Sequence, residues 1–220
     1  MVDEQRERAI NAPWPVTTLI AVLLGAFLVQ GLAGVEPSIL RYGFSPVSLG
    51  QRRWAPLLMA LFLHASWAHV LANCAFALAF GSPTARRMGA DARGGAAFFV
   101  FYLICGILAN LAYAVFHPGD INVVIGASGA VAGLMGAASR LMGGGPDLAP
   151  LYSRSVVAMA CAWVLVNVIF GAVFAGWAPG ANGAPIAWDV HLAGYAVGLF
   201  LFSPALRIIG RRTPDHGIEN

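Results

Sequence analysis

The sequence contains no lysine and few charged residues of any kind. Charged residues make up 10% of its 220 positions, whereas a soluble domain has about a quarter. The 13 basic residues are all arginine, and the formal net charge is only +3. Because no basic stripe with interleaved aromatic residues is present, nothing in the sequence indicates a nucleic-acid-binding surface.

Cysteine is equally scarce. The three cysteines, Cys74, Cys105 and Cys161, lie inside apolar runs, and the sequence has no CxxC pair and no HExxH motif. This spacing argues against a disulfide framework and against a metal site. We therefore expect the cysteines to serve as packing residues.

Apolar residues, in contrast, are abundant. Hydrophobic residues make up 59% of the chain and the mean hydropathy is +0.73, which is typical of a membrane protein. The apolar residues fall into six runs, at 16–35, 68–81, 94–116, 128–142, 155–177 and 191–209. The first run could be a signal peptide, but no A-x-A site follows it and five more runs do. The sequence therefore predicts an all-α bundle of six transmembrane helices.

The arginines predict how this bundle is oriented. Segments 82–93 and 140–154 carry arginine, as do both ends of the chain, and arginine-rich segments favour the cytosolic side. We therefore expect a cytosolic tail at 1–14, a membrane domain at 15–210 and a second cytosolic tail at 211–220. The loop at 36–64 carries three arginines on the external side. We expect it to pack on the protein and the lipid headgroups through short helices.

The fourth run contains one serine among small residues. Ser128 is flanked by Gly126 and Gly129, which allow a sharp turn and a close backbone approach. The run has 15 residues, or about 22 Å of helix, less than the roughly 30 Å needed to cross a bilayer. We expect a short, buried helix that begins below the external surface, where irregular backbone must line a wet cavity or be buried in protein.

The sixth run begins with a histidine, His191. It and the fourth run each carry a pair of glycines four residues apart: Gly129 and Gly133, and Gly194 and Gly198. Packing these small faces together would bring Ser128 and His191 near each other. The imidazole could then take the serine proton, the minimal requirement for acyl transfer. Taken alone, such a histidine is also typical of a residue at the membrane interface.

A third polar cluster is HASWAHVLAN, which contains His64, His69 and Asn73. His69 and Asn73 are four residues apart and share one helix face. Together with the backbone N–H of Ser128 they could stabilise an oxyanion. The alternative is that Asn73 only holds helices together and that both histidines lie at the interface.

The three motifs HxxxxHxxxN, GxSG and HxxGxxxG occur in this order at the second, fourth and sixth runs, and together they resemble the rhomboid family of intramembrane serine proteases. The resemblance implies peptide-bond hydrolysis by a serine–histidine dyad without an aspartate or a cofactor. It implies Ser128 as nucleophile and His191 as general base. His69, Asn73 and the Ser128 N–H resemble the oxyanion hole, and His64 matches a supporting histidine.

The resemblance also implies a location and a kind of partner. Substrates would be transmembrane proteins in the same bilayer, expected to be a bacterial inner membrane, cleaved near its external face. We expect them to enter beside the fifth run, near Phe170, Phe174 and Trp177, under a flexible cap formed by residues 178–187.

Two positions depart from the family's pattern. Family members commonly carry an aromatic residue one turn after the nucleophile, against which the base stacks, whereas this chain has Ala132. We expect Tyr195 or Trp188 to supply the missing ring. The Trp-Arg pair often seen in the first loop is replaced by Trp54 preceded by Arg53.

Other functions fit the sequence less well. The departure at Ala132 allows an inactive rhomboid-like protein that binds transmembrane segments. A small transporter could line a polar path with histidines, but no internal repeat is present. An aspartyl protease would need Asp120 and Asp189 as a pair, yet neither lies within an apolar run and no GxGD motif occurs.

Overall fold

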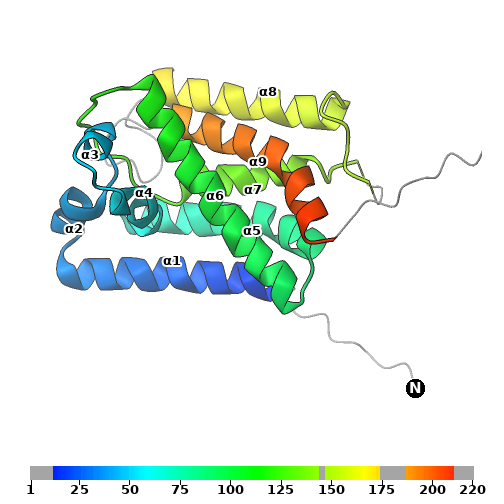
Figure 1. Cartoon of the computed structure of the whole chain (residues 1–220), viewed down its shortest axis with the longest axis horizontal. Coiled ribbons are helices and arrows are strands. Elements are labelled where there is room, and N and C mark those ends of the chain that lie inside the picture. The colour runs from blue at the N-terminus through cyan, green and yellow to red at the C-terminus, as the bar shows by residue number, and fades with distance from the viewer. Residues whose placement is uncertain (1–11, 144–146, 174–186, 211–220) are drawn as a thin grey trace, which may run out of the picture.

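The computed structural model describes residues 12–143, 147–173 and 187–210, and these residues form an all-helical bundle (Figure 1). The longer helices are α1 (Trp14–Ala33), α5 (Trp67–Met88), α6 (Ala92–Phe116), α7 (Ser128–Ser139), α8 (Arg154–Val168) and α9 (Trp188–Ile208). A π-helical turn, Ile169–Val173, extends α8. The short helices are α2 (Val35–Tyr42), α3 (Pro46–Gly50), α4 (Ala55–Met59) and the 3₁₀ turn η1 (Ala60–Phe62).

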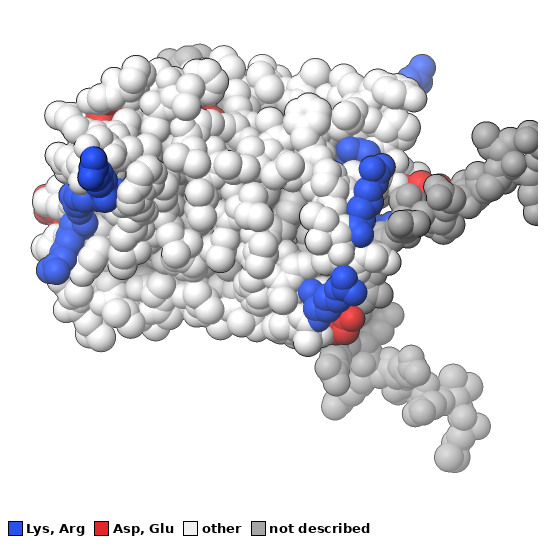
Figure 2. Space-filling model, viewed as in Figure 1, with Lys and Arg blue, Asp and Glu red and all other residues white. Residues whose placement is uncertain are grey.

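Four helical segments are long and apolar enough to cross a membrane: α1, α6, α8 with the start of its π turn, and α9. A fifth candidate is the pair formed by α4–η1 and α5, which is bent by 92°. The charged side chains gather at the two ends of the bundle and leave an uncharged belt between them (Figure 2). The protein is therefore a multi-pass membrane protein with four to five candidate spans among its described residues.

The helix α7 lies inside the bundle rather than on its surface. It packs against α5, α6 and α9, and every residue from Gly129 to Ser139 is buried. Its 12 residues extend about 18 Å, too short to cross a bilayer unaided. The sequence predicted a short, buried helix here; whether α5 and α7 bring the number of crossings to six remains a prediction.

The close contact between α7 and α9 depends on glycine. A Cβ atom at Gly194 would overlap the carbonyl of Gly129, and one at Gly198 would overlap the carbonyl of Gly133. The small faces of the two helices therefore meet backbone to backbone, as the spacing of the glycines predicted. This contact sets the distance between the first turns of α7 and α9.

The segment 36–64 forms α2, α3, α4 and η1, as expected for a loop containing short helices. It is joined to the segment before α7 at three points, one of which is the bond from the N–H of Val47 to the carbonyl of Asp120 at 3.2 Å. Phe44 and Val124 form an isolated antiparallel bridge, and the N–H of Gly126 donates to the carbonyl of Ala60 at 2.8 Å. The loop therefore lies at the end of the bundle where α7 begins.

The expected connection at 82–93 is wrong in its extent. The helix α5 continues through Pro83 to Met88, and Gly89, with φ 108°, ends it. Hydroxyl groups of Ser82 and Thr84 bond carbonyls one turn earlier, a common accommodation of proline in apolar helices. Two of the three arginines that indicated a loop, Arg86 and Arg87, lie in the last turn of α5, where cations interact favourably with the carbonyl end of the helix. The third, Arg93, lies in the first turn of α6.

Candidate active site

Ser128 is the first residue of α7, and its hydroxyl meets the ring of His191 in the first turn of α9. The distance between Ser128 Oγ and His191 Nε2 is 2.9 Å, within ordinary hydrogen-bond range. Both residues are partly buried. The packing of the glycine faces therefore places a hydroxyl against an imidazole.

The turn before Ser128 requires a glycine. Gly126 has φ 112°, a region that favours glycine, and a Cβ atom there would lie 2.8 Å from His69 Nε2. Because Ser128 occupies the first helical position, its backbone N–H has no partner within α7. This N–H and the positive end of the helix dipole lie beside the serine hydroxyl.

His69 stands opposite this turn in the first turn of α5. Ser66 caps the helix by accepting from the N–H of His69 at 3.2 Å. The N–H of Ala65 donates to His69 Nδ1 at 3.5 Å, which favours the tautomer with hydrogen on Nε2. The ring thus presents a donor beside Gly126 and within reach of the space near Ser128.

Asn73 is buried one turn further along α5 and shares a face with His69. Its side-chain amide donates to the carbonyl of His69 at 3.2 Å. This described bond runs back along the helix rather than toward Ser128. The second amide hydrogen is left over after this bond.

His64 lies behind His69 and is fully buried. Its ring meets that of His69 edge to face, with ring centroids 5.0 Å apart, and neither ring nitrogen has a hydrogen-bond partner among the described residues. The backbone of His64 is held by Gln30 of α1. The structure thus places His64 in contact with His69, on the ring that faces Gly126.

Comparison with protein families gives a match over residues 51–207 to the model described as the rhomboid domain. This match covers well over half of the chain and includes Ser128, His191, His69, Asn73 and His64. The chain belongs to the rhomboid family. That family contains serine proteases as well as inactive members. No curated protein matches the chain.

The ring next to His191 in this rhomboid comes from α8. Trp163 has its ring centroid 6.1 Å from that of His191, at an interplanar angle of 39°. Its indole N–H also donates to the carbonyl of His191 at 3.4 Å. In the described part of the chain Trp163 therefore takes the place that the sequence assigned to Tyr195 or Trp188.

The described contacts of those two aromatic residues are with other groups. Tyr195 is buried against Ala132 and Met135, and it fills the space that an aromatic residue at position 132 would need. Trp188 packs over Gly171 near the end of α8, where a Cβ atom would strike its ring.

A second residue of α8 that the sequence reasoning missed is Asn167. Its Oδ1 atom lies 2.9 Å from His191 Nδ1, so the histidine ring is engaged on both nitrogens. The available signal was an asparagine inside an apolar run, because polar side chains at membrane depth are expected to be functional.

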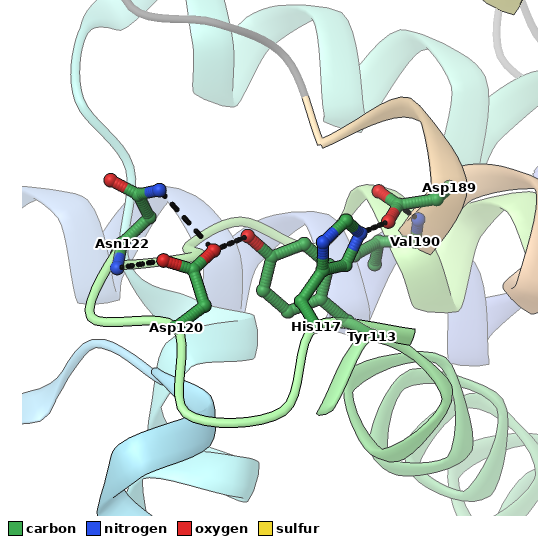
Figure 3. A network of polar contacts seen from close by, with 6 residues as sticks. All are labelled: Tyr113, His117, Asp120, Asn122, Asp189 and Val190. Atoms are coloured by element: carbon green, nitrogen blue, oxygen red, sulfur yellow. Dashed lines mark hydrogen bonds and ion pairs between the residues drawn. The ribbon is translucent and has the colours of Figure 1, made fainter. Parts of the chain in front are cut away.

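A polar network joins the end of α6 to the start of α9 (Figure 3). The ring of His117 binds the carboxylate of Asp189, which also accepts from the N–H of Val190. The next cluster centres on Asp120, whose carboxylate accepts from the N–H of Asn122 and the hydroxyl of Tyr113. These two donors hold the pKa of Asp120 below its usual value.

The network has two consequences. Asp120 and Asp189 each bind their own partners, so they do not form a shared-proton pair of the aspartyl-protease kind. Asp189 also lies in the first turn of α9, two residues before His191, where its carboxylate accepts from the N–H of Val190. In the described ranges, no group of three or more possible metal ligands occurs.

The predicted gate is only partly described. Phe170 is exposed in the π turn that follows α8. Phe174, Trp177 and nearly all of the expected cap at 178–187 lie outside the described residues.

Proposed function

We propose that this rhomboid protein is an intramembrane serine endopeptidase that hydrolyses peptide bonds in or near the transmembrane segments of other membrane proteins. The observation that carries the proposal is the 2.9 Å contact between Ser128 Oγ and His191 Nε2. An imidazole at this distance can accept the hydroxyl proton as the oxygen attacks a carbonyl.

The reaction proceeds in two halves. Ser128 Oγ attacks the scissile carbonyl while His191 takes its proton, and the protonated ring then gives that proton to the leaving amine. The resulting acyl-enzyme is attacked by a water molecule, with His191 again acting as base. Release of the acid product restores the serine hydroxyl, so the cycle needs no metal or cofactor.

Three donors support the developing oxyanion. The N–H of Ser128, which has no partner within α7, is the first, and it lies at the positive end of that helix. The Nε2–H of His69 and the remaining amide hydrogen of Asn73 are the other two. Each such donor contributes about 3 kcal/mol of transition-state stabilisation when correctly placed.

The membrane arrangement follows the same reasoning. Six helices cross the bilayer, both termini lie in the cytosol of a bacterial cell, and the end of the bundle that holds Ser128 faces outward. Substrates approach beside α8, because this helix buries only two of its residues against the rest of the described bundle. It is the least buried of the four single-helix candidate spans, so moving it aside would cost less burial than moving α1, α6 or α9.

A fluorophosphonate probe tests the proposal directly. The folded wild-type protein should be labelled and should cleave a model transmembrane substrate, and Ser128→Ala should lose both activities. Ser139→Ala is the matched control, since Ser139 is a buried serine of the same helix whose hydroxyl donates to the carbonyl of Gly136. Absence of labelling in folded wild-type protein, or its persistence in Ser128→Ala, would exclude the proposed nucleophile.

The second candidate is an inactive rhomboid that binds transmembrane segments, which is favoured by Ala132 in place of the usual aromatic residue. In that case a photo-crosslinkable transmembrane peptide should attach to the protein while the probe does not label it. Labelling and cleavage together would reject this candidate.

A further inference from the structure

One polar side chain of helix α8 points toward the rest of the bundle, within a contact that is otherwise apolar. Its only residues buried in the structure are Val156 and Asn167, and Asn167 is 4% exposed. The remainder of the helix is largely exposed on the outside of the bundle (Figure 1). Because so little of α8 is buried, few of its side chains can contact the neighbouring helices and influence the site.

The orientation of the Asn167 amide follows from its hydrogen bonds. Its Nδ2 donates to the carbonyl of Trp163 at 2.8 Å, one turn earlier. A flipped amide would place Oδ1 against that carbonyl, bringing two acceptors together. The atom that faces His191 Nδ1 at 2.9 Å is therefore Oδ1, an acceptor.

This acceptor fixes the tautomer of the histidine. Since Oδ1 can only accept, the ring hydrogen of neutral His191 is on Nδ1. The lone pair is then on Nε2, which faces the hydroxyl of Ser128 at 2.9 Å. The opposite tautomer would leave Oδ1 facing a lone pair and Nε2 unable to take the serine proton.

We propose that Asn167 is a positioning residue that holds His191 in the base-competent tautomer and orientation, so that the site operates as Ser128, His191 and Asn167 together. This inference rests on the proposed protease function and goes beyond the dyad that the resemblance implies. Trp163 supports the same ring from the same helix.

An amide suits this position better than a carboxylate. The contact lies between two candidate membrane-spanning helices, where an ionised group is costly. A neutral amide orients the imidazole without adding a charge, as asparagine does in Cys-His-Asn proteases. Asn167 also occupies the last turn of α8. Its contact with His191 therefore fixes the register of α8 against α9.

Two substitutions separate positioning from simple packing. Asn167→Leu keeps the volume but removes the acceptor, and we expect kcat to fall about 10- to 100-fold with KM unchanged. Asn167→Asp restores an acceptor and should recover a large part of kcat. Because a carboxylate favours the protonated imidazole, the acid limb of its pH–rate profile should move to higher pH. His69 and Asp189 are the other titratable groups acting on this ring.

The matched control is Asn110→Leu. Asn110 is likewise a buried asparagine in a candidate span and donates to the carbonyl of Leu57. It should lower stability without the selective loss of kcat. Equal kcat losses in the two variants, or no rescue by Asn167→Asp, would overturn the proposal.

A readout independent of activity completes the test. Histidine labelled with ¹⁵N in the full-length protein reports the tautomer of each ring, and comparison with His191→Ala assigns the relevant signals. We expect a protonated Nδ1 in the wild type and a mixture of tautomers in Asn167→Leu. An unchanged tautomer would reject the positioning role, even in a protein whose Ser128 proved unreactive. Conversely, an active wild type with unchanged kcat in Asn167→Leu would reject this role alone.

Discussion

The side chain of Gln30 on α1 binds both backbone groups of His64. Its Nε2 donates to the carbonyl of His64 at 2.9 Å, and its Oε1 accepts from the N–H of His64 at 3.0 Å. Both residues are buried. The Gln30 amide therefore makes the two hydrogen bonds that a neighbouring β-strand would otherwise make to this backbone. It does so where the chain turns from η1 into α5.

Replacing Gln30 with leucine should destabilise the protein. The substitution retains bulk but leaves the buried N–H and carbonyl of His64 unpaired, at about 1–3 kcal/mol for each group. We expect the free energy of unfolding in mixed micelles to fall by about 2–4 kcal/mol. Gln51→Leu is the control, because Gln51 is exposed and its change should have little effect; equal losses at the two positions would contradict this account.

Two glycine-to-alanine changes should act in opposite directions. A Cβ atom at Gly198 overlaps the backbone of Gly133, which cannot move aside, so Gly198→Ala should cost about 1–3 kcal/mol. A Cβ atom at Gly25 of α1 meets nothing within 4 Å, and Gly25→Ala should stabilise by about 0.5–1 kcal/mol. Unfolding measurements on the two variants check this, and a Gly198→Ala variant as stable as the wild type would refute the backbone contact between α7 and α9.

Much of this architecture could be predicted from the sequence. Long apolar runs predicted α1, α6, α8 and α9, and the glycine spacing predicted that α7 and α9 would approach. The rhomboid resemblance, which rested on three motifs, is confirmed by the family match. The roles assigned to Ser128 and the other site residues remain predictions.

The missed features share a physical cause. The helix α8 is apolar almost all round, so its sequence has no polar face to show which side turns inward. The contacts of Asn167 and Trp163 with His191 depend on that rotation, which only packing decides. At the end of α5, charge was taken for a loop although arginine side chains extend easily from a last helical turn.

The loop that contains Asp120 should give a pH-dependent contribution to stability. The N–H of Asn122 and the hydroxyl of Tyr113 lower the pKa of Asp120. A lowered pKa in the folded state adds stability that is present above the ordinary value of about 4 and is lost as the pH falls through the lowered value. Asp120→Asn should therefore be less stable than wild type at pH 7, and the difference should shrink below about pH 4.

Asn122→Ala provides the comparison for Asp120→Asn. It removes the side-chain donor but keeps the backbone N–H that bonds the Asp120 carboxylate. Most of the pH dependence should persist in this variant. A gap between wild type and Asp120→Asn that stays constant from pH 7 to pH 3 would show that the carboxylate is not held in its ionised form.

The space around Ala132 explains how this rhomboid dispenses with the usual aromatic residue there. Ala132 is buried against Tyr195, with Trp163 packed on the same cluster. Ala132→Phe should therefore overpack the site and cost about 1–3 kcal/mol. Trp163→Ala should open a cavity and remove the ring beside His191, lowering both stability and kcat.

Combining the two substitutions tests whether one ring can replace the other. The phenylalanine at position 132 can occupy the volume vacated by Trp163. The double variant should therefore lose about 1 kcal/mol less stability than the two single variants lose together. If a ring on α7 can also support His191, kcat should recover part of the loss seen in Trp163→Ala. Additive stability losses with no recovery of kcat would mean that Ala132 and Trp163 do not share one space, and that the support of His191 depends on α8 itself.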